Sequence, residues 1–399
     1  MKKKHSKKQK AAESAHSYFA KIKVVGVGGG GGNAVSRMYE EMGVRGVEFI
    51  AINADAQDLD NCSVKRKVYI GKNLTKGLGT GMNPDLGRQA AEENRGEIAD
   101  ALKGADLVFV TAGLGGGCGS GAGPFVAEIA REQGALTIGV VTKPFTFEGA
   151  QRNRIAQEAF IKMKEKVDTI ISVPNDRIFS IIKKDTPIIK AFMYIDEVLR
   201  NAVEGIAELI GAPGIVNVDF ADVKAVMANA GPALVGVGVA GGTDRALQAV
   251  NLAINSPLLE VSLEGAKGVL FGVSGGRDLR MLEINDIAKV ISTSIDPTAK
   301  VIFGAYYDRR LPAGKIKVTV VATGFNGQMM RDPDALPTLF GQSSARGQQQ
   351  INANTASDEE TSPSKVSSDK KSSSPPKAGS EKEEKEVWDI PTFLRKKRR

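Results

Sequence analysis

Short apolar runs alternate with longer amphipathic stretches from Lys21 to about Phe325. Four runs in the first half have the length and the Val/Ile/Leu content of buried parallel strands. They are Val47–Asn53, Leu107–Thr111, Leu136–Val141 and Thr169–Val173. Because such runs alternate with helical patterns, we predict an open, doubly wound α/β sheet.

Helical patterns connect these runs and divide the chain. Asn83 and Pro84 are typical of an N-cap followed by proline at the first helical position, and they predict a helix to about Leu102. Apolar residues three or four apart predict a long central helix over 187–211. Beyond it, a second, smaller α/β domain is predicted, with strands near 234–239, 268–273, 301–305 and 315–323 and helices near 243–255 and 282–293.

Both ends of the chain differ in composition from the middle. Residues 1–20 are polar and rich in lysine and predict a disordered basic extension, and residues 326–386 predict a disordered linker because they contain few apolar side chains. Residues 387–399 regain bulky apolar side chains, including the single tryptophan, and end in a basic tip. This segment predicts a peptide that docks on a partner through Trp388, Asp389, Ile390, Pro391, Phe393 and Leu394.

Composition limits the function classes. An apolar content of 42% is that of a globular protein, and no apolar stretch reaches the roughly 20 residues of a membrane span. Two cysteines without zinc-type spacing fit a reducing compartment and no metal site of the protein's own, so we expect a cytoplasmic protein. The net charge is +8, but residues 1–21 carry +6 and residues 395–399 carry +5, so the rest of the chain is mildly acidic at −3. No folded basic face for nucleic acid is therefore expected.

Two glycine clusters, Gly26–Asn33 and Gly113–Gly123, each follow a strand-like run and open a helix-like run. Glycine lets backbone N–H groups approach an anion, and a helix N-terminus behind them adds partial positive charge. On a doubly wound sheet both clusters fall at the carboxyl ends of strands, where ligands bind. The sequence therefore predicts a nucleotide held between them by its phosphates.

The first cluster alone supports a different function. It satisfies G-x-G-x-x-G after a strand, and Asp55 lies at a plausible distance for a ribose contact, which would suggest a monomeric NAD- or NADP-dependent oxidoreductase. That pattern is weak and does not require the second cluster. No G-x-x-x-x-G-K-[ST] occurs, so the chain is not a P-loop NTPase.

The second cluster is more specific, because Gly115–Gly121 resembles the GGGTGTG signature of the tubulin/FtsZ superfamily, and the chain as a whole resembles its bacterial FtsZ branch. The resemblance covers about residues 21–325 and resumes at 389–394. It implies a doubly wound GTP-binding domain over 21–186, the central helix, and a C-terminal GTPase-activating domain over 212–325. The accompanying motifs, in family order, are Asn53–Gln57, Gly77–Pro84, Pro144–Gly149, Pro174–Asp176 and Asn217–Val223.

The resemblance implies GTP and GDP as ligands, with Mg²⁺ held mainly through the phosphates. It assigns the phosphates to Gly29, Gly30, Gly31, Gly32, Asn33, Gly116, Gly117, Cys118, Gly119 and Ser120. It places Thr80, Gly81 and Met82 near the γ-phosphate, Glu148 and Arg152 at ribose and phosphate, Asn175 and Asp196 at guanine, and Phe192 against the base.

The catalytic candidates lie far along the chain from both clusters. Asp219 and Asp222 are three residues apart and would share a helix face, where acidic residues also occur simply because they favour a helix N-terminus. The resemblance implies that this loop, with Asn217, completes the nucleotide site of the next subunit in a head-to-tail filament. Such a contact does not close, so it extends into filaments.

The same resemblance implies a role in cell division. The filaments would form the cytokinetic ring at midcell, on the inner face of the plasma membrane, and membrane-tethering proteins of the FtsA type would bind the terminal peptide. The family usually has threonine where this chain has Cys118, Ser120 and Ala54, and a small residue at Met82. These departures leave a non-hydrolysing, nucleotide-gated scaffold as a further alternative.

Overall fold

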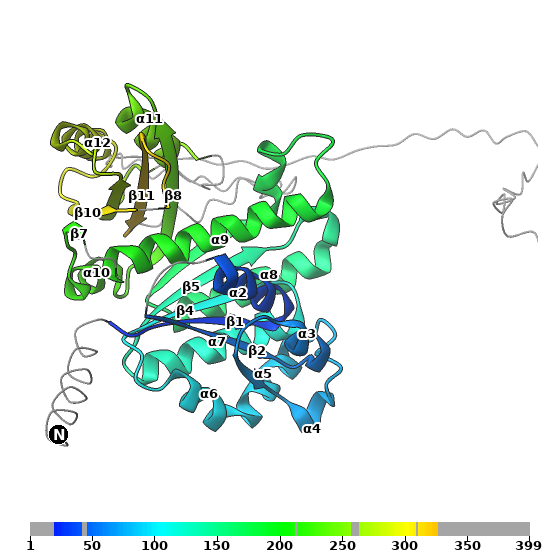
Figure 1. Cartoon of the computed structure of the whole chain (residues 1–399). Helices are drawn as coiled ribbons and strands as arrows, with labels where there is room; N and C mark the ends of the chain where they lie inside the picture. Colours follow the sequence, from blue (N-terminus) through cyan, green and yellow to red (C-terminus); the bar gives the residue numbers. More distant parts are fainter. Residues whose placement is uncertain (1–19, 42–45, 212–213, 257–262, 309, 326–399) are drawn as a thin grey trace, which may run out of the picture. The chain divides into compact units, whose positions relative to one another are not determined.

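The computed structural model describes residues 20–41, 46–211, 214–256, 263–308 and 310–325. The predicted linker and terminal peptide lie outside the described residues, as does all but Ala20 of the basic extension. Within the described part, strands and helices alternate along the chain (Figure 1).

Six parallel strands form the first half of the sheet, in the order β3-β2-β1-β4-β5-β6. Every residue of β1 is buried, which explains its almost uninterrupted apolar sequence. The direction of winding reverses between β1 and β4, so the predicted doubly wound sheet is confirmed. The strands are β1 (Ile22–Val27), β2 (Val47–Asn53), β3 (Arg66–Tyr69), β4 (Leu107–Gly113), β5 (Leu136–Lys143) and β6 (Thr169–Pro174).

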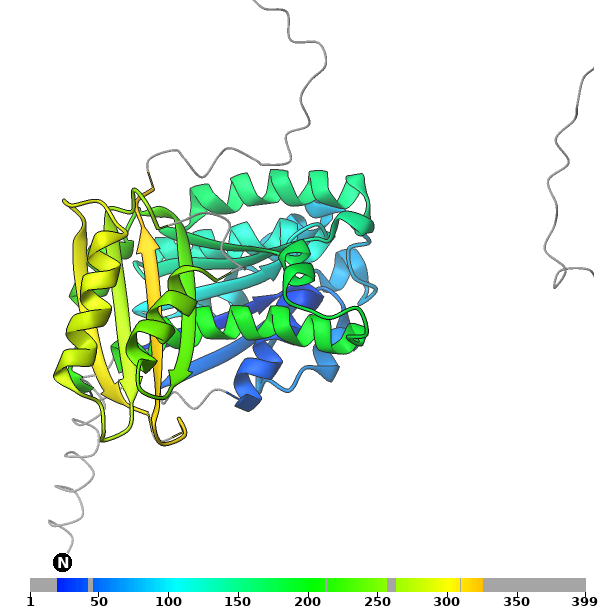
Figure 2. The same cartoon turned by 90° about the horizontal axis from the view of Figure 1, so that it is seen from above.

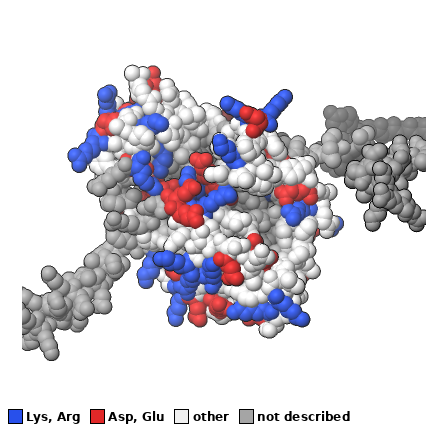
Figure 3. Space-filling view, turned by 45° about the vertical axis from the view of Figure 1, so that its right-hand side comes forward, with Lys and Arg blue, Asp and Glu red and all other residues white. Residues whose placement is uncertain are grey.

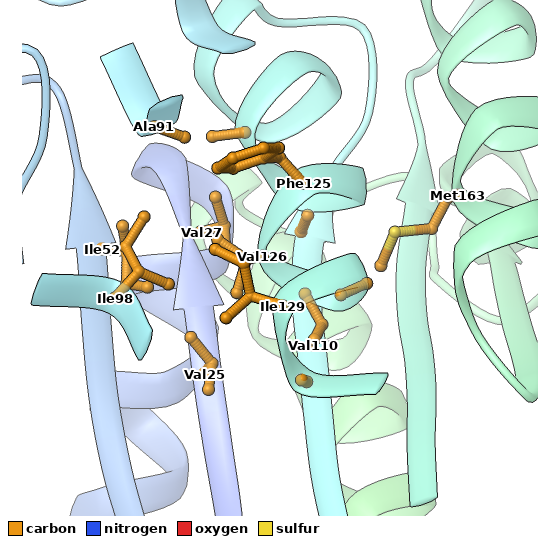
Figure 4. Packing of buried hydrophobic residues seen from close by; sticks show 14 of the residues in the cluster. Val25, Val27, Ile52, Ala91, Ile98, Val110, Phe125, Val126, Ile129 and Met163 are labelled. Atoms are coloured by element: carbon orange, nitrogen blue, oxygen red, sulfur yellow. The ribbon is translucent and has the colours of Figure 1, made fainter. Parts of the chain in front are cut away.

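Helices cover both faces of this half. Alternate residues of β1 enter two cores, Val25 and Val27 on one face and Ile22 and Val24 on the other. Figure 4 shows the first core closely. Its face carries α5 (Pro84–Glu93), α6 (Arg95–Leu102), α7 (Gly117–Glu132) and α8 (Ala150–Lys166), and the other face carries α2 (Gly28–Glu41), α3 (Ala56–Asn61) and α9 (Ile188–Gly211).

The second half extends the same sheet. Three residue pairs join β8 (Gly231–Gly241) to β6, and the order continues through β11, β9, β10 and β7. This half has its own core, in which α11 and α12 pack on the strands (Figure 2). The predicted second α/β unit is therefore present but hydrogen-bonded to the first. Its elements are β7 (Gly214–Val216), α10 (Phe220–Met227), α11 (Arg245–Ile254), β9 (Gly268–Gly275), α12 (Met281–Thr293), β10 (Lys300–Tyr307) and β11 (Lys315–Thr323).

Helix α9 joins the two halves through apolar and charged contacts. Its buried apolar residues share a cluster with strands of both halves. The buried carboxylate of Glu208 accepts hydrogen bonds from Tyr306 Oη at 3.0 Å and Lys317 Nζ at 2.8 Å, and from Arg310. Arg310 also donates to Glu204 at 2.8 Å. These groups tie the central helix to the second half of the sheet.

One local prediction needs correction. The helix predicted from Pro84 to Leu102 is two helices separated at Asn94, whose side chain accepts from Gly71 N at 2.9 Å. The first glycine cluster opens a helix as predicted, since α2 begins at Gly28, directly after β1. None of the described helices is both long and apolar enough to cross a bilayer.

Candidate functional site

The two glycine clusters meet where the sheet changes direction. They follow β1 and β4, which are neighbours and parallel, with Val27 opposite Ala112. A Cβ added to Gly28 would come to 2.9 Å from Gly119 N, and one added to Gly30 to 3.5 Å from Gly113 Cα. The clusters therefore pack against each other at the carboxyl ends of the strands.

Several glycines are required by close packing. A Cβ on Gly26, Gly31, Gly119 or Gly121 would come within 3.0 Å of a backbone oxygen, a separation that real Cβ atoms do not show. These positions allow α2 to approach β1 and β4, and α7 to approach α5. Much of the glycine content thus has a structural cause.

Gly32 and Gly116 are different. A Cβ at either position would meet no protein atom within 4 Å, and neither residue has positive φ. Neither packing nor backbone conformation therefore requires glycine there. Gly116 is the N-cap of α7, a helix of 16 residues, and Gly32 lies in the first turns of α2. Open space beside two helix N-termini suits an anionic group such as a polyphosphate.

Cys118 and Ser120 turn toward the protein. The Cys118 thiol is buried beside the backbone N–H groups of Ala54 and Gly28, and burial raises its pKa to about 11. Ser120 Oγ accepts from Gly115 N at 2.9 Å. Both side chains contact groups of the protein itself. A ligand at the second cluster would therefore be bound by backbone N–H groups of that cluster.

Thr80 and Met82 lie beside the second cluster, whereas a Cβ on Gly81 would meet no protein atom within 4 Å. Thr80 is buried, and a Cβ on Gly117 would come within 3.0 Å of its hydroxyl oxygen. The opposite side is bordered by the start of α8, because a Cβ on Gly115 would lie 3.1 Å from Arg152 O.

Glu148 and Arg152 form an ion pair at this border, with 2.5 Å between Glu148 Oε2 and Arg152 Nη1. The other carboxylate oxygen of Glu148 accepts from Phe145 N at 2.9 Å. Glu148 lies in η1 (Thr146–Glu148), the short helical turn before α8. The structure thus brings two predicted residues together beside the second cluster.

Asn175 begins η2 (Asn175–Ser180), directly after β6. Its Oδ1 is buried and accepts no hydrogen bond from any residue that the structure describes. A buried acceptor without a donor is costly, and an N–H group of a bound base would satisfy it. This orphaned oxygen fits the predicted role of Asn175.

Asp196 of α9 forms an ion pair with Arg37 of α2. Burial raises the pKa of Asp196 to about 6, although Arg37 opposes this increase. Arg37 and Asp196 line a cavity of about 300 Å³ with Tyr194 and Arg200. Sequence analysis missed Arg37, although it lies one helical turn after Asn33 and so shares its face.

Phe192, which is predicted to lie against the base, contacts another aromatic ring of the same chain. It is 43% exposed and meets Phe145 edge to face, with 5.8 Å between the ring centroids. Phe147 and Phe179 also contact Phe145, and both are more than half exposed. The ring belongs to an aromatic cluster at the glycine end of the sheet.

The acidic candidates lie at the opposite end of α9 from Asp196. Helix α9 has 24 residues and is therefore about 36 Å long, and β7 and α10 follow its far end (Figure 1). Asp219 is the N-cap of α10 but makes no side-chain cap hydrogen bond, and both it and Asp222 are exposed. Asn217 Oδ1 accepts from Gly214 N at 2.7 Å. Within one chain these residues do not reach the glycine clusters.

Charge on the described surface is mixed. Figure 3 shows Lys and Arg side chains interleaved with Asp and Glu on the face in view, without a broad stripe of one sign. That face does not have the form of a groove for nucleic acid.

Comparison with known proteins links both halves to one family. Residues 21–183 match the model of the GTPase domain of the Tubulin/FtsZ family, and residues 231–326 match the FtsZ family C-terminal domain. The chain is 45% identical to FtsZ of M. jannaschii, solved as an empty dimer, over 80% of this chain and 92% of that one, with a TM-score of 0.74.

Two further structures come from Haloferax volcanii. CetZ1, solved as a GDP-bound monomer, is 25% identical over 77% of this chain and 95% of its own, with a TM-score of 0.68. CetZ2, solved as a GTPγS-bound protofilament, is 23% identical over 77% of this chain and 94% of its own, with a TM-score of 0.65, and shows a shared fold.

Proposed function

Because this chain belongs to the FtsZ family of tubulin-like GTPases, we propose that it polymerises head to tail and that each GTP site is completed by the acidic loop of the next subunit. The filaments would form the cytokinetic ring. The GTPase assignment replaces the dinucleotide-dependent oxidoreductase and the non-hydrolysing scaffold.

The main support is the separation of the two halves of the active site. The glycine clusters lie at one end of α9, and Asp219 and Asp222 lie beyond its other end with exposed carboxylates. A carboxylate beyond the far end of a helix about 36 Å long cannot orient a water at a phosphate held near the start of that helix. A second copy stacked end to end would bring the acidic loop to the glycine end.

Apolar side chains at both ends favour such stacking. Around the glycine end Phe147, Ile188 and Ile189 are each more than two-thirds exposed. Near the acidic loop, Ile215 and Val216 of β7 are 51% and 37% exposed. Two different apolar surfaces that cover each other give a heterologous contact, which repeats into a filament.

The residues at the glycine end fit a guanine nucleotide. The free N–H groups in the first turns of α2 and α7 would face the phosphates, with the remaining residues of Gly29–Asn33 and Gly116–Ser120 around them. Glu148 and Arg152 would lie at the ribose, and Asn175 and Asp196 at the base. Mg²⁺ would enter with the nucleotide, since phosphate and water oxygens are the ligands that it prefers, and would neutralise phosphate charge. Asp219 and Asp222 would accept hydrogen bonds from a water and orient it for attack.

Trans-complementation tests this proposal. Asp219→Ala should retain nucleotide binding and lose turnover. Gly116→Asp should fold, because no atom lies within 4 Å of its Cβ and aspartate is a favourable N-cap, but should repel phosphates. Neither variant should hydrolyse GTP alone, whereas an equimolar mixture should recover part of the turnover.

Asp244→Ala is the matched control for this experiment. Asp244 is also an exposed N-cap aspartate without a side-chain cap hydrogen bond, at the start of α11. It should leave turnover unchanged. A mixture as inactive as its components, or an Asp219→Ala variant with normal turnover, would show that the acidic loop does not act in trans.

We further propose that residues 387–399 bind membrane-tethering division proteins of the FtsA type, which would hold the filaments at midcell on the cytoplasmic face of the plasma membrane. The segment lies outside the described residues. Its composition and its single tryptophan support the proposal. Fluorescence of Trp388 should change when a tether is added, and deletion of 387–399 should leave polymerisation intact. A constant signal at saturating tether would argue against docking.

A further inference from the structure

The carboxylate of Asp58 lies beside the first turn of α2. Gly29 is the second residue of that helix, and a Cβ added to it would lie 2.5 Å from Asp58 Oδ2 and 3.7 Å from Asp58 Cγ. Outside α2 itself, the described residues place no other atom within 4 Å of that Cβ. Because Cα–Cβ bonds tilt toward the N-terminus of a helix, the carboxylate lies toward the N-terminal end of α2.

Helix α3 holds Asp58 in this position. Asp58 N donates at 3.1 Å to Oδ1 of Asp55, the N-cap of α3, which fixes the first turn of the helix. The next residue, Leu59, is buried in the core cluster that also contains Val35 of α2. Asp58 itself is exposed, so its carboxylate can turn into water when another group takes its place.

Asp58 borders the open space that the proposed function assigns to the phosphates. Gly29 and Gly32 are three residues apart and therefore share a face of α2, and a Cβ at Gly32 would meet no protein atom within 4 Å. The N–H groups of the first helical turn have no partner within the helix, and they carry partial positive charge that attracts anions. The Asp58 carboxylate and a phosphate chain are thus attracted to the same helix end.

We propose that Asp58 weakens nucleotide binding, because its carboxylate competes with the phosphates for the N-terminus of α2. The inference rests on the proposed function, in which the phosphates bind at that helix end. In the nucleotide-free chain the carboxylate interacts favourably with the partial positive charge of the helix. A bound phosphate chain displaces the carboxylate and repels it. Both effects disfavour the bound state, and they therefore favour release of GDP and its exchange for GTP.

Asp58→Asn tests this, because asparagine keeps the size of the side chain and removes its charge. The dissociation constant would be measured by titration with fluorescently labelled GDP, at protein concentrations where light scattering shows no assembly. Asp58→Asn should bind GDP about tenfold more tightly, or by about 1.4 kcal/mol, and should release it more slowly. The gain should shrink as the salt concentration rises, because salt screens interactions between exposed charges.

Asp60→Asn is the matched control. Asp60 is also an exposed aspartate of α3, but residues two apart on a helix do not face the same side. Asp60→Asn should therefore bind GDP with the affinity of the unsubstituted chain.

Three results would overturn the inference. They are equal GDP affinities for Asp58→Asn and the unsubstituted chain, an equal gain in Asp60→Asn, and weaker GDP binding by Asp58→Asn in Mg²⁺. The last result would instead make Asp58 a ligand of the cation that enters with the nucleotide. If the unsubstituted chain bound no GDP, the proposed function itself would fail.

Discussion

Gly121→Ala should destabilise the fold, because the added Cβ would collide with the backbone of α5. Gly121 lies in α7, and its Cβ would come within 3.0 Å of Pro84 O and lie 2.8 Å from Arg88 N, both in α5. Adding atoms to a well-packed site costs about 1–3 kcal/mol. The cost of Gly121→Ala should be near the upper end of this range, because backbone atoms cannot rotate away from the new Cβ as a side chain can. Alanine regains about 1 kcal/mol of helix propensity over glycine. The net loss should be about 2 kcal/mol.

Thermal unfolding followed by circular dichroism measures this loss. A folded unit of roughly 300 residues has an unfolding entropy of about 0.6 kcal/mol/K, so about 2 kcal/mol corresponds to a decrease of roughly 3 °C in Tm. Gly116→Asp supplies the contrast, because its Cβ meets no atom within 4 Å. Its Tm should be unchanged or higher, while a carboxylate at the phosphates should weaken GDP binding about 100-fold or more. An unchanged Tm for Gly121→Ala would refute the packing argument, and normal GDP binding by Gly116→Asp would refute the phosphate site.

Three further outcomes are expected. At neutral pH a maleimide should label Cys62 far faster than Cys118, whose buried thiol has a pKa of about 11; labelling of a Cys62→Ser variant measures the difference. The pKa of Asp196 is raised to about 6, so its protonation favours the folded state. The midpoint of unfolding should therefore rise as pH falls from 7 to 5, whereas GDP affinity should fall. Asp196→Asn should make both the unfolding midpoint and the GDP affinity less dependent on pH. Glu208→Ala should cost about 3 kcal/mol in urea unfolding, because the largely buried Lys317 loses a carboxylate at 2.8 Å and the buried Tyr306 hydroxyl loses its acceptor. Glu132→Ala, in a surface ion pair with 2.5 Å between N and O, should cost less than about 1 kcal/mol.

Local pattern alone determined most of the strands and helices, although it predicted neither β3 nor β7. Runs such as Val47–Asn53 and Lys315–Thr323 match the observed strands end to end, because they are rich in the β-branched residues that strands favour. Asn83 and Pro84 marked the start of α5 through capping chemistry that involves only neighbouring residues. The order of glycine motifs also carried the family assignment, since it is a property of the chain and not of its folded contacts.

Contacts between distant segments decided the rest. The chain ends α5 at Asn94 because that side chain binds Gly71, which no local pattern indicates. Arg37 meets Asp196, which we propose to bind the base, only because α2 and α9 lie side by side. Which glycines serve packing and which border open space depends on how closely α7 approaches α5 and β4. The distance between the acidic loop and the glycine clusters follows from α9 spanning the molecule. These features depend on long-range packing, and the sequence specifies that packing only through the whole fold.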